Sequence, residues 1–144
     1  MHRKLLPLLM FALLAAGCSA PIAGQWRGTM DLGPSAAHDI ELSVIEDGTS
    51  GRIVVTEPHK AFSHFQLCSV HSGDKRAIEL VYDANRPNCD EKNPDPSERR
   101  LLRGTVGEGV LFGDVLRGTE RIGFFRAFRQ ADVQAPEAQE KSTP

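Results

Sequence analysis

The chain has 144 residues, with 17 lysines and arginines against 19 aspartates and glutamates, which gives a formal net charge of −2 at pH 7. A length of this order suits one domain. The mild acidity argues against nucleic-acid binding, because proteins that bind phosphate backbones carry basic surfaces.

The chain starts with a segment typical of export signals. Two basic residues, Arg3 and Lys4, precede an apolar run of 12 residues, 5–16, which contains Pro7. Gly17 separates this run from Cys18. A helix that spans a membrane needs roughly 20 apolar residues, so this run is too short to span one. We expect residues 1–17 to be a signal peptide that is removed on export.

The residues around the expected cleavage point resemble the lipobox of bacterial lipoproteins. Small residues at 15–17 stand directly before Cys18, although Ala15 occupies a place where that motif usually has a branched aliphatic residue. The resemblance implies that Cys18 is acylated on its sulfur and becomes the new N-terminus. Ser19 directly follows the cysteine, and a serine rather than an aspartate at this position resembles lipoproteins that are transferred to the outer membrane.

Lipid attachment would place the protein at the outer membrane, exposed to the periplasm or the cell surface, with residues 18–23 as a lipidated linker. A lipoprotein cysteine carries several acyl chains, and each buried CH2 contributes about 0.8 kcal/mol, so the attachment is expected to be stable. Loss of Arg3 and Lys4 leaves 15 basic against 19 acidic residues, a net charge of −4. The alternative is an ordinary signal peptide cut after Gly17 or Ala20.

Residues 24–129 form a run of short expected strands separated by turn residues, which is the pattern of an all-β domain. In the second strand Ile40, Leu42 and Val44 alternate with polar residues, so one face is apolar. The eight expected strands cover residues 25–32, 38–46, 51–56, 64–70, 76–82, 101–106, 110–116 and 121–128.

Sequential strands joined by short turns favour an eight-stranded antiparallel meander closed into a small barrel, because closure removes the exposed edges of an open sheet. A two-sheet sandwich is the alternative. Side chains are expected to fill most of the interior, which leaves little room for a ligand. The residues expected to point inward are Trp26, Met30, Ile40, Leu42, Val44, Ile53, Val55, Phe65, Leu67, Ile78, Leu80, Leu102, Phe124 and Phe128.

A long connection over residues 83–99 is the candidate binding loop, because loops of this length in compact domains are usually functional or mobile. If Cys18 carries lipid, Cys68 on the fourth strand and Cys89 in the loop remain as a pair in an oxidising compartment, where a disulfide is expected. Such a bridge closes a loop of about 20 residues and contributes roughly 3 kcal/mol in the chain-entropy model. The loop residues singled out for binding are Arg86, Asn88, Asp90, Glu91, Lys92 and Asp95.

No arrangement of residues predicts catalysis, a metal site or a cofactor. The histidines do not stand at the spacing of metal ligands, and the acidic loop lacks the residue order of an EF-hand. Residues 130–144 are mostly Ala, Gln, Glu, Pro, Ser and Thr, so they are expected to form a disordered tail.

Gly24-Gln25-Trp26 on the first expected strand resembles the Gly-x-Trp motif of the calycin group, which includes lipocalins, avidin-like proteins and bacterial periplasmic metalloprotease inhibitors. In lipocalins an arginine on the last strand lies across this tryptophan and closes one end of the barrel. The resemblance implies that Arg126, or alternatively Arg129, does so here, and we take Trp26 and Arg126 as the barrel-closing pair. Cation–π attraction between guanidinium and indole favours such a contact.

These features predict a non-enzymatic, lipid-anchored module that binds or inhibits a periplasmic protein through its loops. The metalloprotease inhibitors act by inserting a free N-terminus, which a lipidated Cys18 does not provide, so inhibition here would require a loop. Two alternatives stay open: a carrier of a small apolar ligand inside the barrel, and a structural envelope lipoprotein without a dedicated ligand.

Overall fold

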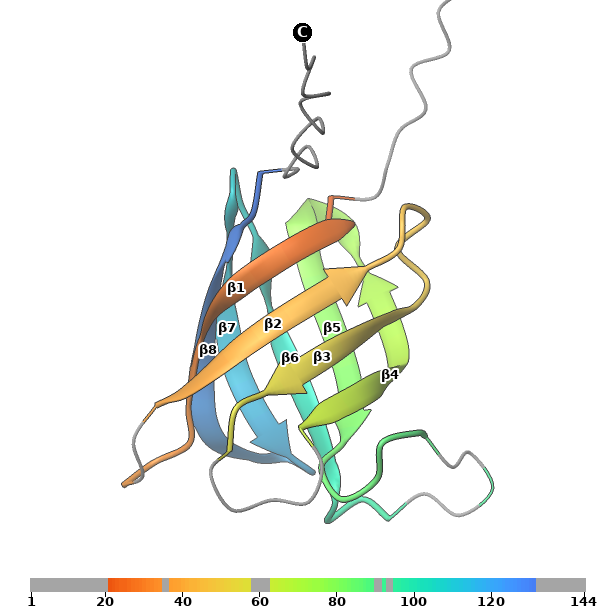
Figure 1. The fold of residues 1–144 in the computed structure, drawn as a ribbon, viewed down its shortest axis with the longest axis vertical. Coiled ribbons are helices and arrows are strands. Elements are labelled where there is room, and N and C mark those ends of the chain that lie inside the picture. The colour runs from red at the N-terminus through yellow and green to blue at the C-terminus, as the bar shows by residue number, and fades with distance from the viewer. Residues whose placement is uncertain (1–20, 35–36, 58–62, 90–91, 93–94, 132–144) are drawn as a thin grey trace, which may run out of the picture.

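The computed structural model describes residues 21–34, 37–57, 63–89, 92 and 95–131. Its strands form one antiparallel meander in which β8 pairs with β1 as well as with β7, so the sheet closes into a barrel (Figure 1). The strands are β1 (Gly24–Asp31), β2 (His38–Val44), β3 (Gly51–Val55), β4 (His64–Ser72), β5 (Ala77–Asp83), β6 (Arg99–Val106), β7 (Val110–Arg117) and β8 (Glu120–Arg129), and the short 3-10 turn η1 (Asp74–Arg76) precedes β5.

The all-β class, the eight antiparallel strands and the closed barrel are confirmed, and the two-sheet sandwich is excluded. The observed strand ends differ from the expected ones by at most two residues, and several coincide with them. Among the described residues, no helix has the length and apolar character needed to cross a membrane. The signal segment 1–17, Cys18, Asp90, Glu91 and residues 132–144 of the expected tail lie outside the described ranges.

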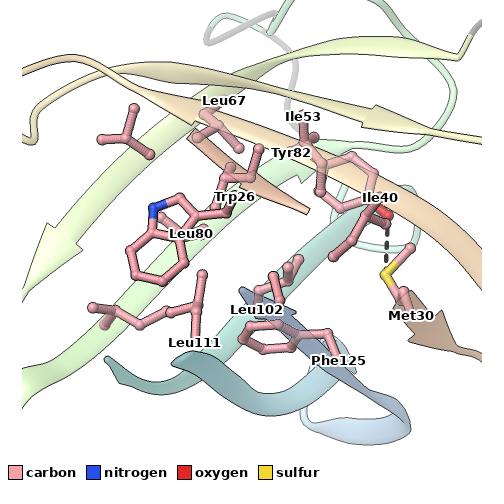
Figure 2. Packing of buried hydrophobic residues seen from close by; sticks show 14 of the residues in the cluster. Trp26, Met30, Ile40, Ile53, Leu67, Leu80, Tyr82, Leu102, Leu111 and Phe125 are labelled. Carbon is pink, nitrogen blue, oxygen red and sulfur yellow. Dashed lines mark hydrogen bonds between the residues drawn. The ribbon is translucent and has the colours of Figure 1, made fainter. Parts of the chain in front are cut away.

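One continuous apolar cluster fills the barrel, and its members are at most 7% exposed. Each strand contributes alternate residues, because successive side chains on a strand point to opposite faces of the sheet. Figure 2 shows these side chains converging from strands on all sides of the barrel. Twelve expected interior residues are confirmed as buried: Trp26, Met30, Ile40, Leu42, Val44, Ile53, Val55, Phe65, Leu67, Ile78, Leu80 and Leu102.

The expected inward face of the last strand was wrong. Phe124 and Phe128 are 51% and 47% exposed, whereas Phe125 and Ala127 are buried. The pairing explains this result, because Phe125 lies opposite Met30 of β1 and Gly113 of β7, and both of these face inward. The run Phe-Phe-Arg-Ala-Phe has apolar residues on both faces, so alternation alone does not choose between them.

The two ends of the barrel differ in what they carry. The start of β1 and the end of β8 lie together at the upper end in Figure 1, and the long connection from β5 to β6 leaves the lower end. The first and last residues of the barrel therefore lie at the opposite end from the candidate binding loop.

Candidate functional site

A plug of N-terminal residues closes the upper end of the barrel. Ile22 is fully buried, and its carbonyl accepts a hydrogen bond of 2.9 Å from the indole Nε1 of Trp26. Arg129 lies over the face of the Trp26 ring, with its guanidinium carbon 4.3 Å from the ring centre. The same guanidinium donates hydrogen bonds to the carbonyls of Ala23 and Pro21, both at 2.5 Å. The folded domain thus begins within the segment 18–23 that was expected to be a linker.

Arg126 was the wrong choice for the barrel-closing pair, and the alternative, Arg129, makes the contact with Trp26. Arg126 points outward, because it occupies the outer face of β8, and its guanidinium lies 5.1 Å from the ring centre of Phe128. Since Arg126 and Arg129 differ by an odd number of positions, they fall on opposite faces of the strand. Gly24 permits the close approach of Arg129, because a Cβ at Gly24 would lie 2.9 Å from an Arg129 nitrogen.

The base of the candidate loop is held against the barrel wall at two adjacent points. The structure joins the sulfurs of Cys68 and Cys89, whose Cα atoms are 5.3 Å apart, a separation typical of disulfides. The amide of Gln66 also donates a hydrogen bond of 2.8 Å to the carbonyl of Pro87. Cys68 stands where the pairing of β4 with β5 shifts register, so the cross-link sits on an irregularity of the strand.

The rest of the described loop is closed by local turns. The amide of Ala84 donates to the carbonyl of Glu98 at 2.9 Å, which brings the two ends of the loop together. Asp95 accepts hydrogen bonds from the amide and hydroxyl of Ser97 at 2.9 and 2.7 Å, and these bonds lower the pKa of the exposed Asp95 carboxyl. Of the predicted binding residues, Asn88, Lys92 and Asp95 are exposed, Arg86 is half-buried, and Asp90 and Glu91 lie outside the described residues.

A groove of about 650 Å³ runs beside the held part of this loop. Its floor is a row of outward-facing side chains that strand pairing places side by side: Gln25 pairs with Ser43, Ser43 with Arg52, and Arg52 with Gln66. The Ser43 hydroxyl donates to the Gln25 side-chain oxygen at 2.5 Å. The lining residues are Gln25, Ser43, Val44, Ile45, Ser50, Gly51, Arg52, His64, Gln66, Pro87 and Asn88.

Sequence reasoning missed this groove except for Asn88. Polar residues on the outer face of a strand look like ordinary solvated positions when each strand is considered alone. Only the register between four strands brings Gln25, Ser43, Arg52 and Gln66 into one row, and the sequence carries no direct signal of that register.

The barrel interior is occupied by its own side chains. The Tyr82 ring packs against Phe65, with ring centres 5.3 Å apart, and its hydroxyl lies 3.9 Å from the sulfur of Met30 (Figure 2). Burial raises the pKa of Tyr82 well above its ordinary value, because an ionised phenolate would lose its hydration there. The barrel core is therefore packed with the side chains of the protein itself.

Within the described parts of the chain, no three His, Cys, Asp or Glu side chains gather as a metal ion would require. Comparison with known proteins finds no matching family model, curated protein or solved structure. The architecture itself, an eight-stranded antiparallel closed barrel whose first-strand tryptophan is covered by a last-strand arginine, is consistent with the calycin-like fold that Gly24-Gln25-Trp26 implied.

Proposed function

We propose that this protein is a lipid-anchored envelope lipoprotein without a catalytic role, which binds another protein through residues 87–89, here called the held loop, and the adjacent groove. The observation that carries the proposal is the double attachment of the loop base to β4, by the Cys68–Cys89 cross-link and the Gln66–Pro87 hydrogen bond. That attachment fixes Asn88 at the rim of an open groove.

A loop that is ordered before binding favours recognition. Association costs free energy for each side chain and segment that must be immobilised, and a segment already held in place avoids part of that cost. Binding residues are commonly found on loops supported by a rigid scaffold, and a closed barrel with a filled core is such a scaffold. The held loop therefore suits a stable interaction surface better than a freely moving connection would.

The chemistry of the groove suits a polypeptide segment that carries carboxylates. Among its lining residues, Arg52 carries a positive charge, while no carboxylate is present. The amides of Gln25, Gln66 and Asn88 can donate to and accept from the backbone of an extended segment. The chain as a whole is acidic, so the groove is a locally positive surface on an acidic protein.

The plug at the upper end supports a loop rather than the N-terminus as the binding element. Ile22 is fully buried and Pro21 is held by Arg129, so insertion of this segment into a partner would require the barrel end to open. Acylation of Cys18 would hold the same segment at the membrane. A carrier role receives less support, because the barrel core is filled by side chains.

Site-specific photo-crosslinking in the native cell tests the proposal. A photo-reactive amino acid replaces Asn88 at the groove rim, and the matched control replaces Thr119, an exposed residue in the turn between β7 and β8. We expect one adduct of defined mass from position 88 and none from position 119. We also expect Arg52→Glu to reduce the yield at position 88, because it reverses the charge of the groove. Absence of an adduct at 88, or equal adducts at both positions, would exclude this surface as the binding site.

A further inference from the structure

We propose that the outer aromatic face of β7 and β8 lies on the lipid surface to which the N-terminal acyl chains attach the protein, an inference that rests on the proposed acylation of Cys18. We define this aromatic face by Phe112, Phe124 and Phe128, with Val110 and Arg126 between them. The three phenylalanines are 50%, 51% and 47% exposed.

The residues of the aromatic face are neighbours on one wall of the barrel. Strand pairing places Val110 opposite Phe128, Phe112 opposite Arg126 and Asp114 opposite Phe124. The Asp114 carboxylate is ion-paired with Arg121 at 2.7 Å. A shallow depression of about 790 Å³ lies over this part of the wall. A soluble protein rarely leaves adjacent aromatic side chains in water without a binding role, because their hydration is unfavourable.

The position of the aromatic face relative to the anchor indicates its occupant. Cys18 precedes Pro21 by three residues, which span at most about 11 Å when fully extended. Pro21 is hydrogen-bonded to Arg129, the residue directly after Phe128. An acylated Cys18 therefore keeps the Phe128 end of the aromatic face close to the bilayer surface.

The chemistry at the Phe128 end of the face suits a lipid surface, because Arg126 can meet headgroup phosphates there, while Asp31 and Asp114 flank Phe124 at the other end. Phenylalanine side chains partition into the boundary between headgroups and acyl chains, and arginine keeps its charge at headgroup level while its stem lies along apolar surface. Arg126 stands among the phenylalanines, 5.1 Å from the Phe128 ring centre, where a lipid phosphate can reach it. The C-terminal residues 132–144 contain no aromatic residue and no aliphatic side chain larger than valine, so they match this face less well.

This contact would also orient the proposed binding groove. In the closed order of eight strands, β7 and β8 are four places from β3 and β4, so the two pairs lie on opposite walls (Figure 1). Lipid contact at the aromatic face would turn Arg52, Gln66 and Asn88 away from the membrane. The part of the groove on β3 and β4 would then be open to a partner in the periplasm, whereas its Gln25 end lies on β1, next to β8.

Fluorescence quenching by brominated lipids tests the contact with the full mature protein. The protein is purified in detergent, its acylation is checked by intact mass, and it is reconstituted on vesicles of phosphatidylethanolamine and phosphatidylglycerol with brominated acyl chains. Phe124→Trp places a reporter in the aromatic face, and Val54→Trp places a matched reporter on the outer face of β3. Trp26 is the single native tryptophan, so the wild-type signal can be subtracted.

We expect the Phe124→Trp emission to lose most of its intensity on brominated vesicles and the Val54→Trp emission to be unchanged. Phe128→Trp serves as a second reporter if the first variant fails to fold. Equal quenching of both reporters, or none in an acylated protein, would overturn the lipid contact while leaving the proposed function intact. An unquenched reporter in a protein that sediments as a dimer would assign the face to a second copy of the chain. A mass without acyl chains would overturn the anchor and the contact together.

Discussion

At the scale of single residues, Arg129 connects the two ends of the folded chain. Its guanidinium stacks on Trp26 of β1 and bonds the carbonyls of Pro21 and Ala23, while its backbone belongs to the last strand. These contacts close the barrel end beside the proposed anchor. The sequence left two candidates, Arg126 and Arg129, for the arginine that contacts Trp26. Choosing between them required knowing which face of β8 points inward, and the phenylalanines on both faces of that strand did not show this.

Replacing Arg129 with alanine is expected to lower the free energy of unfolding by about 2 kcal/mol, from the lost cation–π contact and two charge-assisted hydrogen bonds. Urea unfolding followed by Trp26 fluorescence measures the change. The matched control, Arg126→Ala, removes only an exposed contact with Phe128 and is expected to cost less than about 0.5 kcal/mol. Equal losses in the two variants would contradict the assignment of Arg129 as the closing residue.

Tyr82 makes stability depend on pH in the alkaline range. Its folded pKa is raised above the ordinary value of 10.0 by burial, so the folded protein keeps the phenol proton where the unfolded chain releases it. The stability contributed by this group is complete below pH 10 and is lost as the pH rises above 10, towards the folded pKa.

Tyr82 is the single tyrosine, so phenolate absorbance is expected to appear only as the protein unfolds. Tyr82→Phe is expected to remove this part of the alkaline decrease in urea midpoint. Phenolate absorbance in a protein that still shows the native circular dichroism would argue against deep burial of the phenol.

At the scale of elements, the positions of the strands were predictable from alternation and turn residues. Which face of a strand points inward depended on its pairing with neighbouring strands. β2 has polar residues on one face and apolar residues on the other, so its inward face was correctly predicted. β8 has phenylalanines on both faces, and its register with Gly113 and Met30 decides which of them enters the core. The aromatic face escaped prediction for the same reason.

The paired glycines Gly104 and Gly113 let β6 and β7 approach closely beside Phe125. A Cβ at Gly104 would lie 2.1 Å from the Phe112 carbonyl oxygen, which belongs to the rigid backbone. We expect Gly104→Ala to destabilise the protein by about 2 kcal/mol, as overpacking does. At Gly107 the nearest atom would be 3.7 Å away, so Gly107→Ala is expected to change stability by less than about 0.5 kcal/mol. Comparable midpoints for the two variants in thermal unfolding would show that the strands can separate there.

The cross-link between β4 and the loop is expected to stabilise the fold and to hold the loop. Its cysteines are 21 positions apart, a separation for which chain entropy predicts about 3 kcal/mol. Replacing both cysteines with serine should lower the free energy of unfolding by this amount, and it should speed hydrogen exchange at the Gln66 amide. Two thiols that react with a maleimide in the oxidised, folded protein would contradict the pairing.

At the scale of the whole molecule, the proposed account divides the barrel into three regions. The upper end carries the plug and the expected anchor, the wall from β1 to β4 carries the groove and held loop, and the β7–β8 wall carries the aromatic face. The sequence predicted the closed barrel and the loop, because both follow from local patterns along the chain. It did not predict the groove or the aromatic face, since each is assembled by register between strands that are distant in sequence.

The acylated N-terminus is the central claim, because it sets the location of the protein and the lipid contact of the aromatic face. Intact-mass analysis of the protein purified from the envelope fraction tests it most directly. The account predicts a chain that starts at Cys18 and carries fatty acyl chains, and a Cys18→Ala variant that lacks them. A wild-type chain that starts at another residue, or one that starts at Cys18 without added acyl mass, would contradict the account.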